Sequence, residues 1–342
     1  MSNLKDIAQK ANVSVATVSK VLNGTGNVNP ETIETVLSIS RELNYQPNIY
    51  ARSLKKGQSH AIGVITEDLT VFNTPEIIDG VGACCEKRKY YCILGNMRLE
   101  KRPINLNMAP AKYEATISEA VDRMIAMRVD GIIYLGSHSH SVFTLPKPEN
   151  IHCVCAYCYS TDPQIPSVQY NDRMAAFKAT ELLINAGHKN IGVIAGPSSS
   201  VHTTGRLLGC QEALFTHGIP YNPAYTLYGD WGRDQGYDLG EQLIKAGVTA
   251  IFAHNDLMAL GVIDYCNKCG LSVGKDIALV GFDNREISSV CRPSLSTVAL
   301  PLYEIGYTAA EILLDVLEGK PVEHANKVFL DCTVIEREST LG

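Results

Sequence analysis

Short apolar runs rich in β-branched residues recur along most of this sequence, and their spacing constrains the fold more than any other feature. The runs occupy residues 62–65, 91–94, 132–135, 191–194, 226–228, 250–253 and 277–280. Amphipathic stretches separate the runs. In the part of the chain that holds the runs from 191–194 to 277–280, these stretches start near Arg173, Thr203, Asp234 and Asp256. Strands that alternate with helices form parallel βαβ units. The sequence from residue 61 onward therefore predicts two doubly wound α/β lobes with parallel sheets.

The first 50 residues have a different pattern, which predicts three short helices. Apolar residues at helical spacing cover residues 4–11, 15–23 and about 30–44. Ser14 is placed to cap the second helix, and Asn29, followed by Pro30, is placed to cap the third. A short helix, a tight turn and a second helix form a helix-turn-helix, whose second helix enters the major groove of DNA. The alternative is a three-helix bundle whose polar face has no role in DNA binding.

The outward face of the second predicted helix carries side chains suited to reading DNA. Small side chains contact thymine methyl groups, hydroxyl groups bond to phosphates, and a lysine binds guanine or phosphate. The residues on this face are Val15, Ala16, Thr17, Ser19, Lys20 and Asn23. We therefore expect double-stranded DNA as a partner.

Charge is distributed unevenly along the chain. Residues 1–60 hold seven Lys and Arg and four Asp and Glu, so their net charge is +3. Because the whole chain has a net charge of −6, residues 61–342 have a net charge of −9. A small basic head on an acidic body is typical of a DNA-binding module joined to another domain. The polar N-terminus and the lack of an apolar run of about 18 residues predict a cytoplasmic protein with no membrane partner.

Four short segments carry a recognisable pattern: LKDIA at 4–8, VSVATVS at 13–19, NYQPN at 44–48 and ARSL at 51–54. They resemble the head and hinge of the LacI/GalR family of transcription regulators, and the similarity continues through most of the chain. The resemblance implies an all-α helix-turn-helix head plus a body of two lobes like the type I periplasmic binding proteins. It places the DNA-binding domain at 1–46, the hinge at 47–60 and the effector-binding and dimerisation domain at 61–342. Within that domain the N-lobe is expected at about 61–160 plus 296–322, and the C-lobe at about 161–295 plus 323–342.

By the same resemblance, Val15, Ala16 and Lys20 read an operator half-site while Thr17 and Ser19 contact the DNA backbone. In the family the hinge folds into a helix on the operator and inserts a leucine into the minor groove, which implies such a role for Leu54, flanked by Asn48 and Lys55. The alternative for Leu54 is ordinary packing against the body. A homodimer with two heads implies a pseudo-palindromic operator.

Polar residues that follow the predicted strands of the second lobe mark an effector site. Arg206, Asn255 and Asp283 lie in or after three such loops and match the family's ligand-binding arginine, asparagine and aspartate. Trp231, the only tryptophan, lies in a glycine-flanked loop and can stack on a sugar ring. Position alone adds three weaker candidates, each of which has a structural alternative: Phe72, His202 and Leu302.

Two Cys-x-x-Cys pairs, at 155/158 and 266/269, raise the possibility of a zinc or redox site. Neither pair has a complementary array of histidines and cysteines, so we interpret the eleven cysteines as reduced core thiols. His138 and His140 lie on one loop, and we expect them to be solvated rather than metal-bound. No metal or cofactor is predicted.

These features together predict a DNA-binding transcriptional regulator, a repressor, whose operator affinity is controlled by a small effector, for which we expect a sugar. A nucleoside, another metabolite or a protein corepressor in place of the sugar remains an alternative. An enzyme is not expected because no Walker loop, G-x-S-x-G or G-x-G-x-x-G motif is present. A transport receptor would have no use for residues 1–57. The sequence does not decide whether the effector releases or recruits the operator.

Overall fold

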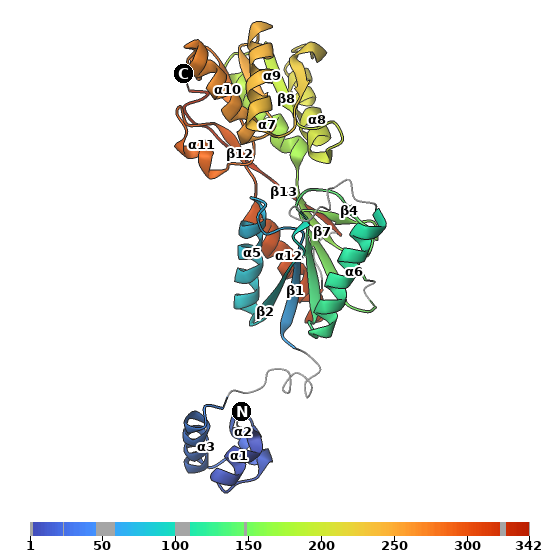
Figure 1. Ribbon diagram of the computed structural model, residues 1–342, viewed down its shortest axis with the longest axis vertical. Coiled ribbons are helices and arrows are strands. Elements are labelled where there is room, and N and C mark those ends of the chain that lie inside the picture. The colour runs from blue at the N-terminus through green and yellow to red at the C-terminus, as the bar shows by residue number, and fades with distance from the viewer. Residues whose placement is uncertain are drawn as a thin grey trace. The chain divides into compact units, whose positions relative to one another are not determined.

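Figure 1 shows the computed structural model, which describes residues 3–22, 24–45, 59–99, 110–146, 149–321 and 326–341. The chain divides into two compact units, Met1–Ser59 and His60–Gly342, which are treated separately below. Four predicted DNA-binding residues, Asn23, Asn48, Leu54 and Lys55, lie outside the described residues, as does the predicted hinge helix.

The first unit contains three helices, α1 (Leu4–Lys10), α2 (Val15–Leu22) and α3 (Pro30–Glu42). Asn3 and Asp6 form a capping box at the start of α1, and the Asn29 side chain caps α3. Ser14 Oγ accepts a hydrogen bond from the Thr17 amide at 3.0 Å and thereby caps α2. The three predicted helices are confirmed.

One apolar face of each helix of the first unit meets in a small core. Its buried members are Ile7, Ala8, Val18, Val21 and Val36. These residues follow helical spacing within each element, so burying them fixes which side of each helix faces outward.

The first lobe of the second unit is built on a six-stranded sheet in the order β13-β7-β5-β3-β1-β2, with parallel pairing throughout. The strands are β1 (Ala61–Thr66), β2 (Tyr91–Asn96), β3 (Gly131–Leu135), β5 (His152–Ala156), β7 (Ser167–Tyr170) and β13 (Lys327–Leu330). A separate pair, β4 (Ser141–Val142) and β6 (Tyr159–Ser160), lies beside it.

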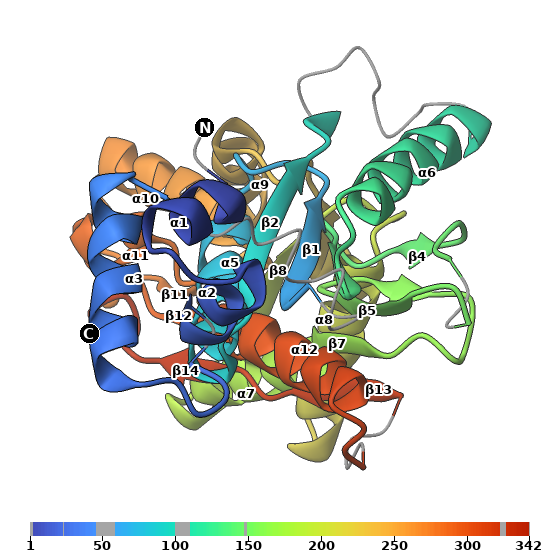
Figure 2. The same cartoon turned by 90° about the horizontal axis from the view of Figure 1, so that it is seen from below.

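Helices cover both faces of this sheet, as Figures 1 and 2 show. On one face, α5 (Thr74–Arg88) and α12 (Leu302–Leu317) pack on Ile62, Val64 and Ile133. On the other face, α6 (Pro110–Ala126) packs on Ile65 and Ile132. Neighbouring residues of one strand therefore enter different cores, which explains why these strands read as continuous apolar runs.

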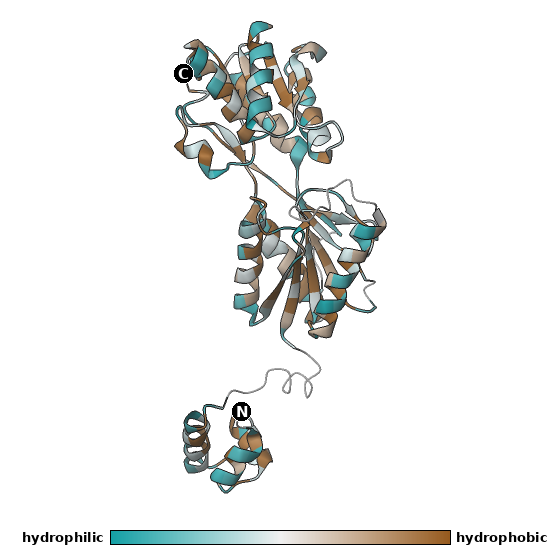
Figure 3. Ribbon diagram, in the orientation of Figure 1, coloured by the Kyte–Doolittle hydropathy of each residue, from teal (hydrophilic) through white to brown (hydrophobic). Residues whose placement is uncertain are grey.

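The second lobe has a four-stranded parallel sheet in the order β11-β10-β8-β9. Its strands are β8 (Ile191–Ala195), β9 (Thr226–Tyr228), β10 (Ala250–Ala253) and β11 (Ala278–Val280). Its helices are α7 (Asp172–Asn185), α8 (Val201–Thr216), η2 (Pro223–Tyr225), α9 (Arg233–Lys245), α10 (Asp256–Cys269) and α11 (Glu286–Val290). Figure 3 shows hydrophobic strands between helices with hydrophilic outer faces in both lobes.

The predicted fold class is confirmed, and each of the seven apolar runs forms a strand. The predicted lobe boundaries are wrong at three points. β7 and β13, assigned to the C-lobe, pair with each other and with β5 in the first lobe's sheet. β12 (Thr297–Ala299), assigned to the N-lobe, pairs with β14 (Thr333–Ile335) and bridges from Ala299 to Asp283 of the second lobe. The chain therefore crosses between lobes near residues 171, 300 and 331.

Candidate functional site

The outward face of α2 is the candidate DNA-reading surface of the first unit. Val15 is 41% exposed, Ala16 and Lys20 are exposed, and Thr17 and Ser19 are partly buried. The aliphatic part of Lys20 lies beside Gly26, where an added Cβ would be 3.3 Å from Lys20 Cδ. The predicted residues that the structure describes thus share one accessible face, opposite buried Val18 and Val21.

A second candidate site is a cleft of about 580 Å³ lined by residues of both lobes of the second unit. Six of the seven predicted effector residues line it: Phe72, His202, Arg206, Trp231, Asn255 and Asp283. They come from the loop before α5, from α8 and from the loops after β9, β10 and β11. Carboxyl ends of parallel strands meet at one sheet edge, which explains why residues far apart in sequence gather here.

Leu302, the seventh predicted effector residue, does not line this cleft. It is the first residue of α12, is buried and belongs to the core of the first lobe. It borders a different cavity of about 480 Å³ together with Glu76 and Glu304. The assignment of Leu302 to the cleft is therefore wrong, because α12 turns its first apolar residue into the core.

Arg206 is a buried cation fixed by several acceptors. Its Nε donates to Asp172 Oδ1 at 2.8 Å, Nη2 donates to Tyr170 Oη at 2.8 Å, and Nη1 donates to the His254 carbonyl. The guanidinium carbon lies 3.6 Å from the centre of the Phe282 ring. A guanidinium has five N–H groups, so Arg206 keeps donors for a ligand while its position is already fixed.

Asp172 holds Arg206 and His202 together. His202 Nδ1 lies 2.7 Å from Asp172 Oδ2, and the His202 ring stacks on Tyr170 with 7° between planes. Burial by itself would raise the pKa of Asp172, but the contacts with His202 and Arg206 bring the pKa below its usual value. Asp172 therefore stays ionised where it holds Arg206 and His202, and its position in the sequence did not single it out.

Asp283 is the acceptor of this wall that is not used internally. Its side chain is 8% exposed, and Oδ1 lies 3.8 Å from Arg206 Nη2. Among the described residues none donates a hydrogen bond to the Asp283 carboxylate. Burial raises the pKa of Asp283 to about 8, although the charge of Arg206 opposes this shift. A ligand hydroxyl can meet the donors of Arg206 and the acceptor of Asp283 side by side.

Trp231 lies directly against the backbone of the loop after β8. An added Cβ at Gly196 would be 2.1 Å from Trp231 Cζ2, so only glycine leaves room for the ring. Asn255 donates from Nδ2 to the Trp231 carbonyl at 3.0 Å and caps α10 through its Oδ1. Asn255 thus fixes the loop that presents the tryptophan, in addition to lining the cleft.

In the first lobe, a buried carboxylate organises the loop that faces the cleft. Glu67, at the end of β1, accepts hydrogen bonds from Tyr113, Tyr134 and the amide and hydroxyl of Ser137, and lies 3.0 Å from His140 Nε2. Burial opposes ionisation of Glu67, but the hydrogen bond and charge of His140 help to lower the pKa of Glu67 to about 2. Burial likewise opposes protonation of His140, but the hydrogen bond and charge of Glu67 help to raise the pKa of His140 to about 9. The prediction that His140 is a solvated loop residue is therefore wrong, since it is paired with Glu67.

Sequence reasoning missed several residues of the cleft. Ser137, Ser139, Tyr157, Leu257 and Arg285 also line it. The Arg285 guanidinium carbon lies 5.0 Å from the centre of the Phe72 ring. Position after a strand end was the available signal for Ser137 and Ser139, which follow β3 directly.

No group of three or more potential metal-binding side chains occurs in the part of the chain that the structure describes. Most cysteines are buried free thiols, including Cys155, Cys158 and Cys266, but Cys92 and Cys269 are exposed, so the prediction of core thiols is wrong for these two. Within the same described ranges no helix is long and apolar enough to cross a membrane.

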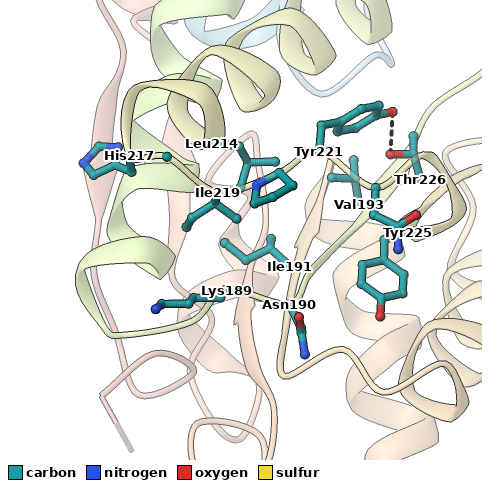
Figure 4. A pocket seen from close by; sticks show the side chains of 13 residues that line it. Lys189, Asn190, Ile191, Val193, Leu214, His217, Ile219, Tyr221, Tyr225 and Thr226 are labelled. Atoms are coloured by element: carbon teal, nitrogen blue, oxygen red, sulfur yellow. Dashed lines mark hydrogen bonds between the residues drawn. The ribbon is translucent and has the colours of Figure 1, made fainter.

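A further cavity of about 440 Å³ lies at the other end of the second lobe, where the α7–β8 turn meets the end of α8 and the start of β9 (Figure 4). Lys189, His217 and Tyr221 are among its lining side chains, and the Tyr221 hydroxyl is bonded to Thr226. None of the predicted site residues lies there.

Comparison with known proteins agrees with this division into a helical head and an α/β body. Residues 3–48 match the model of the bacterial regulatory proteins of the lacI family, and residues 180–340 match that of the periplasmic binding protein-like domain. The HTH-type transcriptional repressor CytR of Escherichia coli (strain K12) is 33% identical, over 99% of this chain and 96% of its own length.

Solved structures agree over the full chain. The Lac repressor dimer bound to operator and the anti-inducer ONPF has a TM-score of 0.79 and 27% identity, and the comparison covers 100% of this chain and 99% of that chain. The complex of the transcriptional regulator CelR with cellobiose has a TM-score of 0.62 and 25% identity, covering 99% and 100%. With full-length similarity to a repressor above 30% and a matching head, this chain belongs to the lacI family of bacterial regulatory proteins and is a DNA-binding transcription regulator.

Proposed function

We propose that this regulator is a cytoplasmic repressor that binds a pseudo-palindromic operator as a homodimer, and that a sugar in the cleft controls its operator affinity. The observation that carries the sugar assignment is the pairing of Arg206 with Asp283 in a cleft that also presents Trp231. Neighbouring hydroxyls of a sugar need both a donor and an acceptor, and an aromatic face stacks on the C–H face of the ring.

The dimensions of the cleft favour an effector larger than one hexose ring. A cavity of about 580 Å³ is in the usual range of sites for drug-sized ligands and has space for two rings. A disaccharide fits this volume, and the relative CelR has been solved with cellobiose. Phe72 from the first lobe and Trp231 from the second provide aromatic surface for the ligand on both sides of the cleft.

A nucleoside is the second candidate, for a specific reason. The cleft has more aromatic surface than one sugar ring can stack on, because it is lined by Phe72, Tyr157 and Trp231. A planar base stacks on such rings, while its ribose hydroxyls can use Arg206 and Asp283. The choice between a sugar and a nucleoside therefore depends on whether a planar base stacks on these aromatic side chains.

In the proposed mechanism, the effector changes the relative position of the two lobes because it contacts both. The chain crosses between the lobes near residues 171, 300 and 331, so the lobes move relative to each other about these short crossing segments. An effector that binds one lobe arrangement more tightly shifts the population toward it, and the operator affinity follows through linkage. The sign of the change depends on which arrangement suits the operator.

The decisive experiment measures binding of the purified full-length protein to a palindromic duplex with a central CG step, at fixed salt, with a panel of mono- and disaccharides and nucleosides. We expect one sugar to change operator affinity at least tenfold, which is about 1.4 kcal/mol of coupling. Trp231 fluorescence should change over the same concentration range. An Arg206→Ala variant should bind DNA without any response to the sugar.

The outcomes separate the parts of the proposal. A response to a nucleoside and to no sugar would replace the sugar assignment. Operator binding that no small molecule alters would point to a protein corepressor. If no such palindromic duplex is bound above the level of random DNA, the operator assignment is wrong.

A further inference from the structure

A hydrogen bond joins the two lobes across the effector cleft, beside the crossing segment near residue 171. The Ser139 amide, in the loop that follows β3 of the first lobe, donates to His202 Nε2 on α8 of the second lobe at 3.1 Å. Both residues line the cleft. The contact between Phe72 and Arg285 also spans the cleft, with 5.0 Å from the guanidinium carbon to the ring centre.

His202 is held in one orientation and one tautomer by its own lobe and by the adjacent crossing segment. Because Nε2 accepts the Ser139 proton, the ring proton lies on Nδ1, which is 2.7 Å from Asp172 Oδ2 and 3.0 Å from the Tyr170 hydroxyl. The ring stacks on Tyr170 at 5.5 Å between centroids. The Nε2 acceptor is therefore fixed in place by protein groups alone.

The donor is fixed equally well in the first lobe. Ser139 Oγ donates to Gln169 Oε1 at 2.7 Å, and the same loop is anchored by the bonds of Ser137 to Glu67 at 2.7 and 2.8 Å. The Ser139–His202 bond thus exists only within a narrow range of lobe positions.

We propose that the Ser139–His202 hydrogen bond is a latch that holds the lobes together across the cleft and thereby sets the equilibrium that the effector shifts. The regulatory role of the latch rests on the proposed function of the cleft, whereas its effect on lobe separation does not. Both groups are solvated by water when the lobes separate, so the latch contributes the net value of one neutral hydrogen bond, a factor of about five in the equilibrium. Such a factor leaves both arrangements populated and lets a ligand decide between them.

The test uses the full-length, effector-free protein and three variants. His202→Asn retains an amide that can donate to Asp172 but removes the Nε2 acceptor. Ser139→Pro removes the amide donor. Ser139→Ala is the matched control, because it keeps the amide and removes only the hydroxyl bond to Gln169. The double variant His202→Asn/Ser139→Pro completes the cycle.

Two readouts report lobe separation without DNA or effector. Quenching of the single tryptophan, Trp231, by acrylamide reports access to the cleft, and small-angle X-ray scattering reports the radius of gyration. We expect His202→Asn and Ser139→Pro each to increase quenching and the radius of gyration by the same amount, with no further increase in the double variant. Ser139→Ala should stay closer to the wild type than either of these variants, because Ser137 still anchors the loop to Glu67. Thermal midpoints should show that each variant is folded.

Three results would overturn the latch: both single variants equal to Ser139→Ala, unequal effects of the two single variants, or additive effects in the double variant. Because none of these measurements involves operator or sugar, failure of the latch is distinguishable from failure of the proposed function. A Ser139→Pro variant that does not fold is replaced by Ser139→Gly with His202→Phe. In that pair only His202→Phe should open the cleft, and an unchanged cleft in His202→Phe would equally contradict the proposal.

Discussion

Asp283 is the residue of the proposed effector site with the most unusual backbone and a strongly shifted pKa. Its backbone has a φ of 104°, an unusual value for a residue with a side chain, and it follows β11 at the edge where the second lobe meets the crossing segments. Strained backbone of this kind persists where the surrounding structure requires it, often at ligand sites. At Asp283 the strained backbone directs a buried carboxyl group toward Arg206.

Effector binding should depend on pH through Asp283. Burial raises the pKa of Asp283 to about 8, so much of the group is protonated at pH 7. A ligand hydroxyl that donates to the carboxylate favours the ionised form, and binding then releases a proton. Affinity should therefore rise by up to tenfold per pH unit as the pH approaches 8 and level off above it. Titration calorimetry from pH 6 to 9 tests this, and Asp283→Asn should bind more weakly with a flat profile.

The same shift predicts an effect on stability with the opposite pH dependence. A carboxyl whose pKa is raised on folding stabilises the protein below its unfolded value and loses that contribution as the pH rises through the folded value of about 8. The thermal midpoint of Asp283→Asn should exceed that of the wild type at pH 9 and approach it at pH 5. A wild-type affinity that does not change between pH 6 and 8 would contradict the assignment of Asp283.

Gly196 shows how one missing side chain makes room for a large aromatic ring. Trp231, with a φ of 74°, places its ring over Gly196. Gly196→Ala should displace the indole, weaken effector binding at least tenfold and shift the fluorescence of the effector-free protein. Gly82→Ala on α5 is the matched control because no atom lies within 4 Å of its added Cβ. Unchanged effector affinity in Gly196→Ala would show that the Trp231 ring has no role in binding.

At the level of elements, α2 is defined by a short set of local signals. Ser14 caps its start, Val18 and Val21 are buried against α1 and α3, and Val15, Ala16 and Lys20 are exposed. A substitution at one of these exposed positions leaves the core intact, so its effect on DNA binding can be separated from its effect on folding.

Ala16→Glu should abolish operator binding while leaving the head folded. Ala16 is exposed on α2, and a carboxylate there repels the DNA phosphates and removes the small surface that the groove needs. We expect at least a hundredfold loss of affinity in an anisotropy titration. Ser38→Glu, which adds the same charge to an exposed position of α3, should lose much less. Equal losses in the two variants would mean that net charge, and not the α2 face, governs binding.

Elements that carry a strong local signal were predicted correctly, whereas those that depend on distant partners were missed. Runs such as 62–65 and 132–135 are buried on both faces, so their hydrophobicity is continuous and easy to read. β7 and β13 are four residues long, include Gln169 and Lys327, and pair across about 160 positions of sequence. No local pattern indicates which sheet such strands join, and the predicted lobe boundaries failed at these strands.

The site followed the same rule. Residues that follow strong strands, such as Asn255 and Asp283, were predicted because the sheet edge collects them. Leu302 failed because a crossing segment leads into a helix that buries it. Asp172 and Glu67 were missed because their importance comes from buried partners on other elements, which the sequence does not reveal without the fold.

For the whole molecule, the sheet edge formed by β2 is the surface best suited to the proposed dimer. β2 is the outer strand of the six-stranded sheet, beside β1, and Tyr91 and Leu94 on it are 64% and 44% exposed. An exposed apolar edge strand is a liability that native proteins normally cover. A second copy related by a two-fold axis would cover it and would supply the second head for a palindromic operator.

Leu94→Glu should therefore weaken the dimer, because it buries a charge in an apolar contact between two identical edges. In analytical ultracentrifugation at micromolar concentration we expect the variant to sediment as a monomer and the wild type as a dimer. Operator affinity should fall with the dimer, since one head contacts half the site, and should recover partly at higher protein concentration through mass action. Phe329→Glu is the matched control: Phe329 is 55% exposed on β13, the opposite edge of the same sheet, and its variant should remain dimeric. Dissociation by Phe329→Glu with Leu94→Glu intact would move the two-fold axis to the other edge of the sheet, and with it the expected spacing of the two heads on DNA.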